Sequence, residues 1–126
     1  MVEADTMRSK WLTHKNKQIF YQDFSGYGFL DMEPLKRELA EVQEVVIQAP
    51  ENSVLVLTDF RETSIGRDLM ELLTASSRVT KSHIKKTAVL GVTGTKRIFA
   101  DMLVRLTGQQ LSFFDQEEAA RDWLVK

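Results

Sequence analysis

The most informative stretch of the chain is VLVLTD at residues 54–59. Its four consecutive apolar residues, β-branched at alternate positions, are typical of a strand that is buried on both faces. A second run, AVLGV at residues 88–92, has the same character. Because strands of this kind occur in parallel sheets that are covered by helices, the two runs predict an α/β fold.

Helical patterns alternate with these strands. Between residues 35 and 46, apolar residues recur at spacings of 4, 3 and 4, which places them on one helical face. Three further helices are expected, after Ser64, after Thr95 and after Asp115. The second of these is expected to bury one apolar face made of Ile98, Phe99, Met102, Leu103 and Leu106.

Two β-rich runs, WLTH at 11–14 and IFYQDF at 19–24, precede the first helix and indicate a β-hairpin. A last short strand is expected at LSFF, residues 111–114. The order ββαβαβαβα predicts a single α/β domain with a mostly parallel sheet and right-handed crossovers. We expect residues 1–9 to be a flexible lead-in and residues 10–126 to form the domain.

Composition excludes several kinds of chemistry. The 126 residues include no cysteine and only two histidines, so disulfides, thiolate metal sites and cysteine nucleophiles are excluded and a histidine-rich metal centre is not expected. No nucleophile, base and orienting group can be assembled from the motifs, which predicts a non-enzymatic protein without cofactor or metal. The polar N-terminus is unlike a signal peptide, so the cytoplasm is the expected compartment, with peripheral membrane association as an alternative.

Several segments, taken in order, resemble the SpoIIAA-like branch of the STAS superfamily. They are WLTHK at 11–15, YQDFSG at 21–26, SVLVLTD at 53–59, KTAVLGVTGTKRI at 86–98, and the region from FFD at 113–115 to Leu124. The resemblance spans about residues 11–126. It implies one domain of βα units in a right-handed superhelix, related in fold to CRAL-TRIO lipid-binding domains. It also implies a non-enzymatic, partner-binding protein.

STAS antagonists of anti-sigma factors are often phosphorylated on a serine that opens the helix after the third strand. Here residues 58–66 read TDFRETSIG, without the Asp-Ser-Ser triplet of that pattern. Thr63 or Ser64 would take the serine's place, since phosphate at a helix N-terminus meets free amides. The favoured interpretation is that Ser64 is an ordinary helix N-cap.

An aromatic loop, SGYGFL at 25–30, joins the hairpin to the first helix. Tyr27, Phe29 and Leu30 would form a mobile lid over an apolar pocket or a membrane-touching tip. The favoured alternative is structural: Leu30 forms a hydrophobic staple with Leu35, Asp31 caps the helix, and Phe29 packs beneath it.

Charge is unevenly distributed although the net charge is only −1. Residues 67–105 hold 8 basic and 3 acidic residues. Because parallel strands end at one edge of a sheet, Asp59, Ser64, Arg67, Lys96 and Arg97 are expected to share that edge, where ligands of open α/β sheets bind. A solvated helix face is the simpler interpretation of the basic residues, and the single aromatic in this stretch argues against nucleic acid.

The leading hypothesis is therefore a regulatory or binding domain that recognises a protein partner or small ligand at this carboxyl edge. One alternative is an apolar-ligand, lipid-binding or peripheral membrane protein that uses the aromatic loop and the basic cluster. A second is a phospho-regulated, anti-sigma-factor-antagonist-like switch centred on Ser64. A homodimer is compatible with each.

Overall fold

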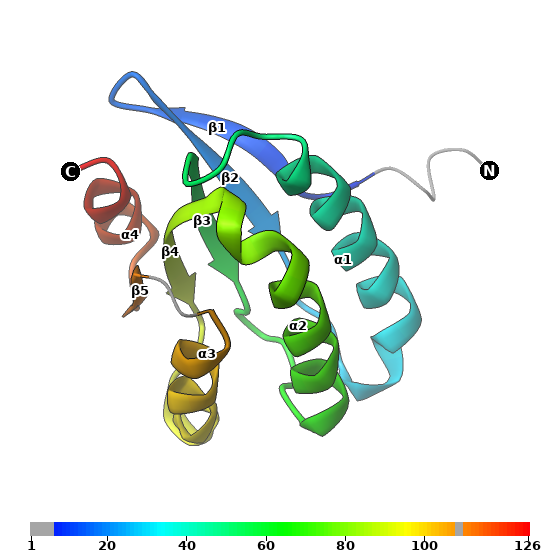
Figure 1. Cartoon of the computed structure of the whole chain (residues 1–126). Helices are drawn as coiled ribbons and strands as arrows, with labels where there is room; N and C mark the ends of the chain where they lie inside the picture. The colour runs from blue at the N-terminus through cyan, green and yellow to red at the C-terminus, as the bar shows by residue number, and fades with distance from the viewer. Residues whose placement is uncertain (1–6, 108–109) are drawn as a thin grey trace.

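The computed structural model describes residues 7–107 and 110–126, and shows one five-stranded sheet (Figure 1). The strands are β1 (Lys10–His14), β2 (Lys17–Asp23), β3 (Val54–Asp59), β4 (Ile84–Leu90) and β5 (Gln110–Phe114). Their order in the sheet is their order in the sequence. The hairpin pair β1–β2 is antiparallel and the other three pairs are parallel.

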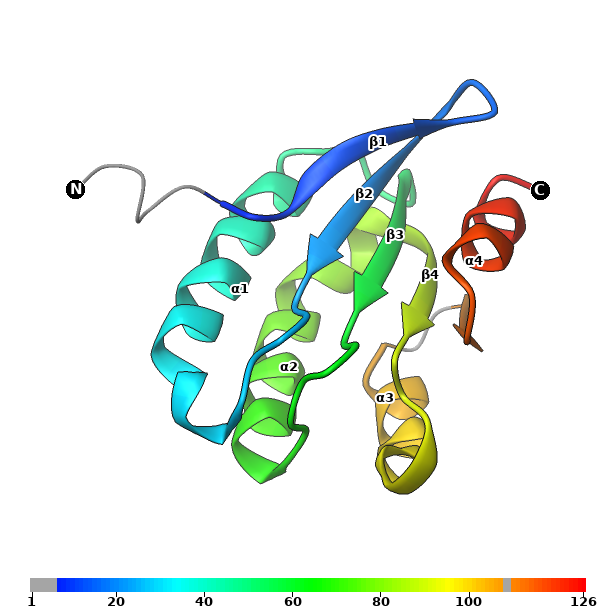
Figure 2. The ribbon, with the colours of Figure 1, turned by 180° about the vertical axis from the view of Figure 1, so that it is seen from behind.

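The described residues also form four α-helices and three short 3₁₀ segments, and all of them except the last helix, which follows β5, lie between strands. The helices are α1 (Met32–Ile47), α2 (Arg67–Thr80), α3 (Ala100–Thr107) and α4 (Glu117–Leu124), and the 3₁₀ segments are η2 (Phe29–Asp31), η3 (Lys81–His83) and η4 (Gly94–Phe99). The helices α1 and α2 lie over one face of the sheet, and α4 lies on the other (Figure 2). The predicted α/β class and the order ββαβαβαβα are confirmed.

The sheet separates two apolar clusters, as the VLVLTD stretch predicts. Val54 and Val56 of β3 belong to the larger cluster, which α1, α2 and α3 cover. Leu57 points the other way and packs with Ala120 and Leu124 of α4. Alternate side chains of β3 thus enter different clusters, which explains why the strand is apolar throughout. Among the described residues, no helix is long and apolar enough to span a membrane.

The region predicted to be one helix after Thr95 is two segments, η4 and α3. Ile98 is 74% exposed and Met102 is also exposed, whereas Leu103 is buried. The predicted apolar face is therefore wrong at Ile98 and Met102, whereas Phe99 packs against the larger cluster as predicted. A 3₁₀ segment has about three residues per turn, so the α-helical spacing that placed Ile98 on the buried face does not apply there.

The start of α1 also differs from the prediction. Leu30 is 99% exposed and Phe29 is 67% exposed, so neither the staple with Leu35 nor the packing of Phe29 beneath the helix forms. The Asp31 carboxylate accepts a hydrogen bond from the backbone N–H of Gly28 at 2.7 Å. Asp31 is the N-cap residue of α1, as predicted, but its side chain makes no capping bond to α1 and instead closes the 3₁₀ segment η2. The inserted 3₁₀ turn moves the two side chains outward.

Candidate functional site

The carboxyl edge of the sheet gathers the loops that follow β2, β3 and β4, which lie together at the lower end of Figure 1. Asp59 ends β3, Ser64 lies in the loop before α2, Arg67 is the first residue of α2, and Lys96 and Arg97 lie in η4. These five predicted site residues are therefore on one edge, as parallel topology requires. Their side chains have different surroundings.

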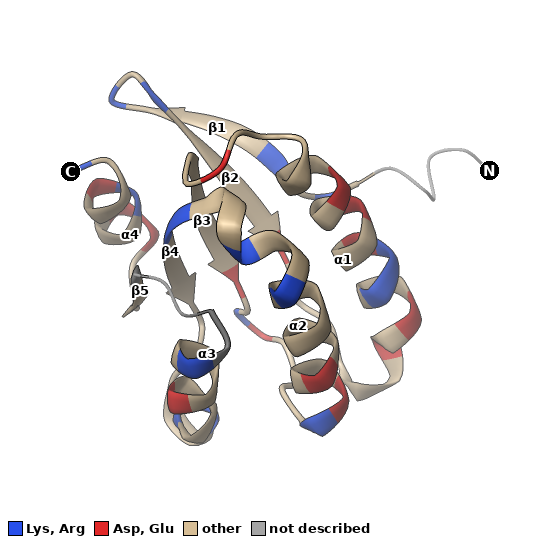
Figure 3. Ribbon diagram, in the orientation of Figure 1, with Lys and Arg blue, Asp and Glu red and all other residues tan. Residues whose placement is uncertain are grey.

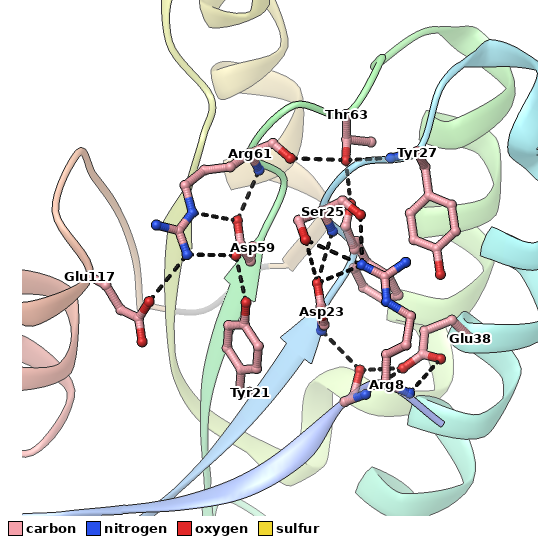
Figure 4. A network of polar contacts seen from close by, with 12 residues as sticks. Arg8, Tyr21, Asp23, Ser25, Tyr27, Glu38, Asp59, Arg61, Thr63 and Glu117 are labelled. Atoms are coloured by element: carbon pink, nitrogen blue, oxygen red, sulfur yellow. Dashed lines mark hydrogen bonds and ion pairs between the residues drawn. The ribbon is translucent and has the colours of Figure 1, made fainter. Parts of the chain in front are cut away.

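Asp59 is the centre of a buried polar network (Figure 4). Its side chain is 1% exposed. One carboxylate oxygen accepts hydrogen bonds from the Tyr21 hydroxyl at 2.6 Å and the Arg61 Nη2 at 2.8 Å. The other oxygen accepts hydrogen bonds from the backbone N–H and the Nε of Arg61, at 2.9 and 3.0 Å. The carboxylate thus has four donors within the protein.

These contacts set the ionisation of the network. Burial by itself raises the pKa of Asp59, but the hydrogen bonds from Arg61 and Tyr21 outweigh burial, and the pKa lies below its ordinary value. Burial and the neighbouring Asp59 carboxylate raise the pKa of Tyr21. Asp59 is therefore an ionised structural anchor.

Arg61 links this network to α4 through an ion pair. Its Nη2 lies 3.1 Å from a carboxylate oxygen of Glu117, and Glu117 is also paired with Arg121 one turn later. The end of β3 is thereby joined to the helix on the far face of the sheet. The network contains charges of both signs paired with each other, so its main consequence is to fix the loop after β3.

A second network holds the aromatic loop (Figure 4). Arg8 donates hydrogen bonds to the Asp23 carboxylate at 3.0 Å and to the Ser25 carbonyl at 2.7 Å, and its guanidinium lies 4.6 Å from the ring centre of Tyr27. The Glu38 carboxylate accepts hydrogen bonds from the backbone N–H groups of Arg8 and Ser9. Residues 8 and 9 are thus bound to the domain, while residues 1–6 of the predicted lead-in lie outside the described residues.

Thr63 connects the aromatic loop to the loop after β3. Its buried hydroxyl donates to the Phe24 carbonyl and accepts a hydrogen bond from the backbone N–H of Tyr27 at 3.2 Å. Tyr27 itself is buried. Transfer of a phosphate to Thr63 would have to break these bonds, so Ser64 is the more accessible of the two predicted acceptors.

Ser64 is half-buried, and its backbone N–H is bonded to the Tyr27 carbonyl at 2.8 Å. The N-cap of α2 is Gly66, two residues later, so the expectation that Ser64 caps the helix is wrong. The physical reason is that the chain is not yet helical at Ile65, whose side chain is buried in the larger cluster.

Lys96 and Arg97 are neighbours with different roles. The Lys96 ammonium donates hydrogen bonds to the carbonyls of Phe60 and Thr63, each at 3.2 Å, and therefore holds the loop after β3 from the side of η4. Arg97 is exposed. Of the two, Arg97 is the residue whose charge faces solvent.

A hollow of about 190 Å³ lies between η2 and the start of α2. Phe29, Ser64 and Arg67 line it, together with Met32, Gly66, Asp68 and Leu69. A ring atom of Phe29 would lie 3.1 Å from a Cβ at Gly66, so the ring stands directly against the beginning of α2. The structure thus brings three predicted site residues to one depression, with the exposed Leu30 adjacent in sequence to Phe29.

A separate cavity of about 90 Å³ lies between the sheet and the helices. Its lining is largely apolar and includes Phe24, Val56 and Leu103, with Gln22 and Thr58 hydrogen-bonded to each other at 3.0 Å. Pockets for drug-sized ligands have volumes of roughly 300–1,000 Å³. This cavity is much smaller, and it gives no support to the lipid-binding alternative.

The residues that sequence reasoning missed are Tyr21, Arg61, Arg8 and Glu117. Arg61 has the clearest signal, because it lies two residues after an acidic residue at a strand end. Tyr21 follows from strand alternation, since it shares the Asp59 face of the sheet. Arg8 and Glu117 come from distant segments, and no local pattern identifies them.

The fold is similar to that of a protein of known structure. No family model matches the sequence, and no curated protein matches it. The structure is similar to the crystal structure of an uncharacterized DUF3478-family protein with a SpoIIAA-like fold from Shewanella loihica PV-4, at 17% sequence identity and a TM-score of 0.65. The match covers 92% of this chain and 91% of the other. The chain therefore has a SpoIIAA-like fold, as the sequence resemblance indicated.

Proposed function

We propose that this chain, with its SpoIIAA-like fold, is a non-enzymatic binding domain that docks a partner protein at the carboxyl edge of its sheet. The supporting observation is the exposure of Phe29, Leu30 and Ile98, which are 67%, 99% and 74% exposed. All three lie in the 3₁₀ segments η2 and η4 at that edge. Apolar side chains presented by a rigid edge are typical of interaction surfaces.

The charge around these side chains favours a protein over an anionic membrane. The edge segments 28–33, 61–68 and 94–101 contain four basic and five acidic residues. Membrane association through a single amphipathic surface is strengthened by an excess of positive charge, and this edge has none. An apolar centre with a mixed polar rim is the usual composition of a protein–protein interface.

The hollow beside Phe29 is a concave site that fits a side chain of a partner protein. Its apolar wall is formed by Phe29 and Leu69, and Arg67 stands at its border. A partner that places an apolar side chain in the hollow and a carboxylate beside Arg67 would satisfy both features. The proposed partner is therefore a protein segment that combines an apolar anchor with an acidic neighbour.

The test compares two surface variants. Leu30→Asp changes the edge, and Val79→Asp changes an exposed apolar residue in the last turn of α2. Proteins cross-linked to the wild-type chain in its host are identified by mass spectrometry. We expect Leu30→Asp to lose specific partners that Val79→Asp retains. Identical partner sets for all three chains would contradict the proposal, as would binding of the wild type to anionic vesicles that Leu30→Asp abolishes.

A second candidate function is the phosphorylation switch at Ser64, favoured because Ser64 lines the same hollow. Among the described residues, no side chain caps α2, so its first N–H groups are available to an anion. A phosphate on Ser64 would lie near these groups and Arg67, and would fill the hollow. Intact mass of protein from its host should then show a phosphorylated fraction. An entirely unmodified population, with no phenotype for Ser64→Ala, rejects the switch.

A further inference from the structure

Trp11 stands between two hollows at the end of the molecule opposite the carboxyl edge. It is 45% exposed, and its ring packs on Phe20 with ring centres 4.9 Å apart. One hollow, of about 470 Å³, is lined by Trp11, by Glu41, Glu44 and Val45 of α1, and by Gln48 and Ala49, which follow that helix. The other, of about 560 Å³, is lined by Trp11, Gln18, Ala49, Pro50, Ser53 and Val54.

The carboxyl-terminal half of α1, which lines the hollow beside Trp11, carries acidic residues and no basic residue. Residues 38–55 contain four glutamates and no Lys or Arg; Figure 3 shows acidic residues on several turns of α1. Glu38 is already bound by Arg8 and Ser9. Glu41 and Glu44 form no ion pair with any described residue, although Arg37 lies one turn earlier on the same helix.

The direction of α1 adds to this negative potential. The C-terminal end of a helix carries a partial negative charge that basic residues normally offset. The last turn of α1 has no basic residue, and it begins with Glu44. Two carboxylates that form no ion pair with a described residue, and the negative end of a helix, therefore line one hollow.

We propose that the hollow formed by Trp11, Glu41 and Glu44 binds an arginine side chain from an extended, basic segment of a partner protein. The planar guanidinium stacks on an indole face and pairs with carboxylates, and no other side chain does both as well. The adjoining hollow, with Pro50 and Val54, accepts a neighbouring apolar side chain. This site lies away from the carboxyl edge and does not depend on the function proposed for it.

The strand that carries Trp11 supports an extended partner. β1 is at the edge of the sheet and pairs only with β2 among the described strands. The outer backbone groups of an edge strand are available to pair with an added chain. A segment lying along β1 would direct alternate side chains to the Trp11 side of the sheet, which matches the two hollows.

The experiment uses the full chain with Trp123→Phe, so that Trp11 is the sole tryptophan. Its fluorescence is titrated with the peptide acetyl-Arg-Val-Arg-Val-Arg-amide and with the same peptide carrying uncharged citrulline in place of arginine. We expect a saturable change with the arginine peptide, and binding weaker by about tenfold or more for citrulline and for the Glu41→Gln/Glu44→Gln variant. Circular dichroism checks that each variant is folded.

A matched control separates a defined site from general attraction. The double variant Glu33→Gln/Glu71→Gln removes the same charge from exposed positions elsewhere, and it should bind the peptide within about twofold of the wild type because the lost charges are far from Trp11 and screened by salt. The proposal is overturned if the arginine peptide gives no saturable change at millimolar concentration, if Glu41→Gln/Glu44→Gln binds normally, or if both double variants weaken binding equally.

Discussion

The two ends of the sheet use charge in opposite ways. At the carboxyl edge, Asp59 is paired with Arg61, Asp23 with Arg8, and the Lys96 ammonium with two carbonyls. At the Trp11 end, Glu41 and Glu44 have no cationic partner among the described residues. At the carboxyl edge, where these charged groups are bound within the fold, exposed apolar side chains are the main groups available for recognition. At the Trp11 end, the charges themselves are available to a ligand.

The largest expected effect tests the rigidity of the carboxyl edge. Gly91 has a φ of +88°, and a Cβ there would lie 2.6 Å from the carbonyl carbon of Phe60 and 2.7 Å from the Cα of Arg61. Because backbone cannot give way cheaply, Gly91→Ala should lower the free energy of unfolding by about 4 kcal/mol. Gly94→Ala is the control: its φ is +59° with open space around it, and about 1–2 kcal/mol is expected. Equal losses in urea denaturation would contradict this account.

The next effect tests whether Asp59 is a structural anchor. Asp59→Ala removes the carboxylate that accepts four hydrogen bonds. The Arg61 guanidinium then loses its partner on the buried side. We expect a loss of about 3 kcal/mol, at the low end for a broken buried pair because Arg61 is partly exposed. The exposed Asp115→Ala should change stability by less than about 0.5 kcal/mol. A similarly small effect for Asp59→Ala in thermal or urea unfolding would mean that the carboxylate is not part of the scaffold.

The same residue predicts a dependence on pH. The pKa of Asp59 is lower in the folded chain than its ordinary value, so its contribution is complete above the unfolded pKa, near 3.9, and is lost as pH falls through the folded pKa. The stability difference between wild type and Asp59→Asn should therefore shrink between pH 6 and pH 2. Urea denaturation at several pH values measures it, and a constant difference would refute the lowered pKa.

The smallest expected effect is at the Trp11 end of the sheet, where a substitution should stabilise the protein rather than destabilise it. Glu44→Gln removes a negative charge from the last turn of α1, so the free energy of unfolding should rise by about 0.5 kcal/mol. Glu117→Gln, which removes a partner of Arg61, should lower it by a similar amount. High salt should reduce both changes. If both substitutions changed the free energy of unfolding in the same direction, the proposed difference in charge pairing between the two ends of the sheet would be refuted.

The fold was predictable because its signals are local. The uninterrupted apolar run of β3 requires helices on both faces, and parallel topology then brings Asp59, Ser64, Arg67 and Lys96 to one edge. The exposure of Leu30 was not predictable from the staple rule, since that rule assumes that the chain enters an α-helix directly. Here η2 intervenes.

The chemistry of the candidate site was less predictable, because it depends on distant partners. Asp59 was singled out as a residue at a strand end, but its role follows from Arg61, which reaches Glu117 on α4. Lys96 was expected to face a ligand, and its ammonium is instead bonded to carbonyls of another loop. Local sequence places a charged residue at an edge, whereas tertiary contacts determine whether its charge remains free.

The agreement between strand order and sequence order has a consequence for how the chain assembles. Each strand pairs with its successor, as Phe20 does with Val56 and Thr87 with Leu111, so no pairing has to wait for a later segment to arrive. Sequential pairing keeps each crossover to a single βα unit, although closing a parallel crossover is itself slower than closing a hairpin. A chain that leaves the ribosome amino-terminus first can therefore add each βα unit to an edge that already exists, and the growing sheet presents one unfinished edge at a time.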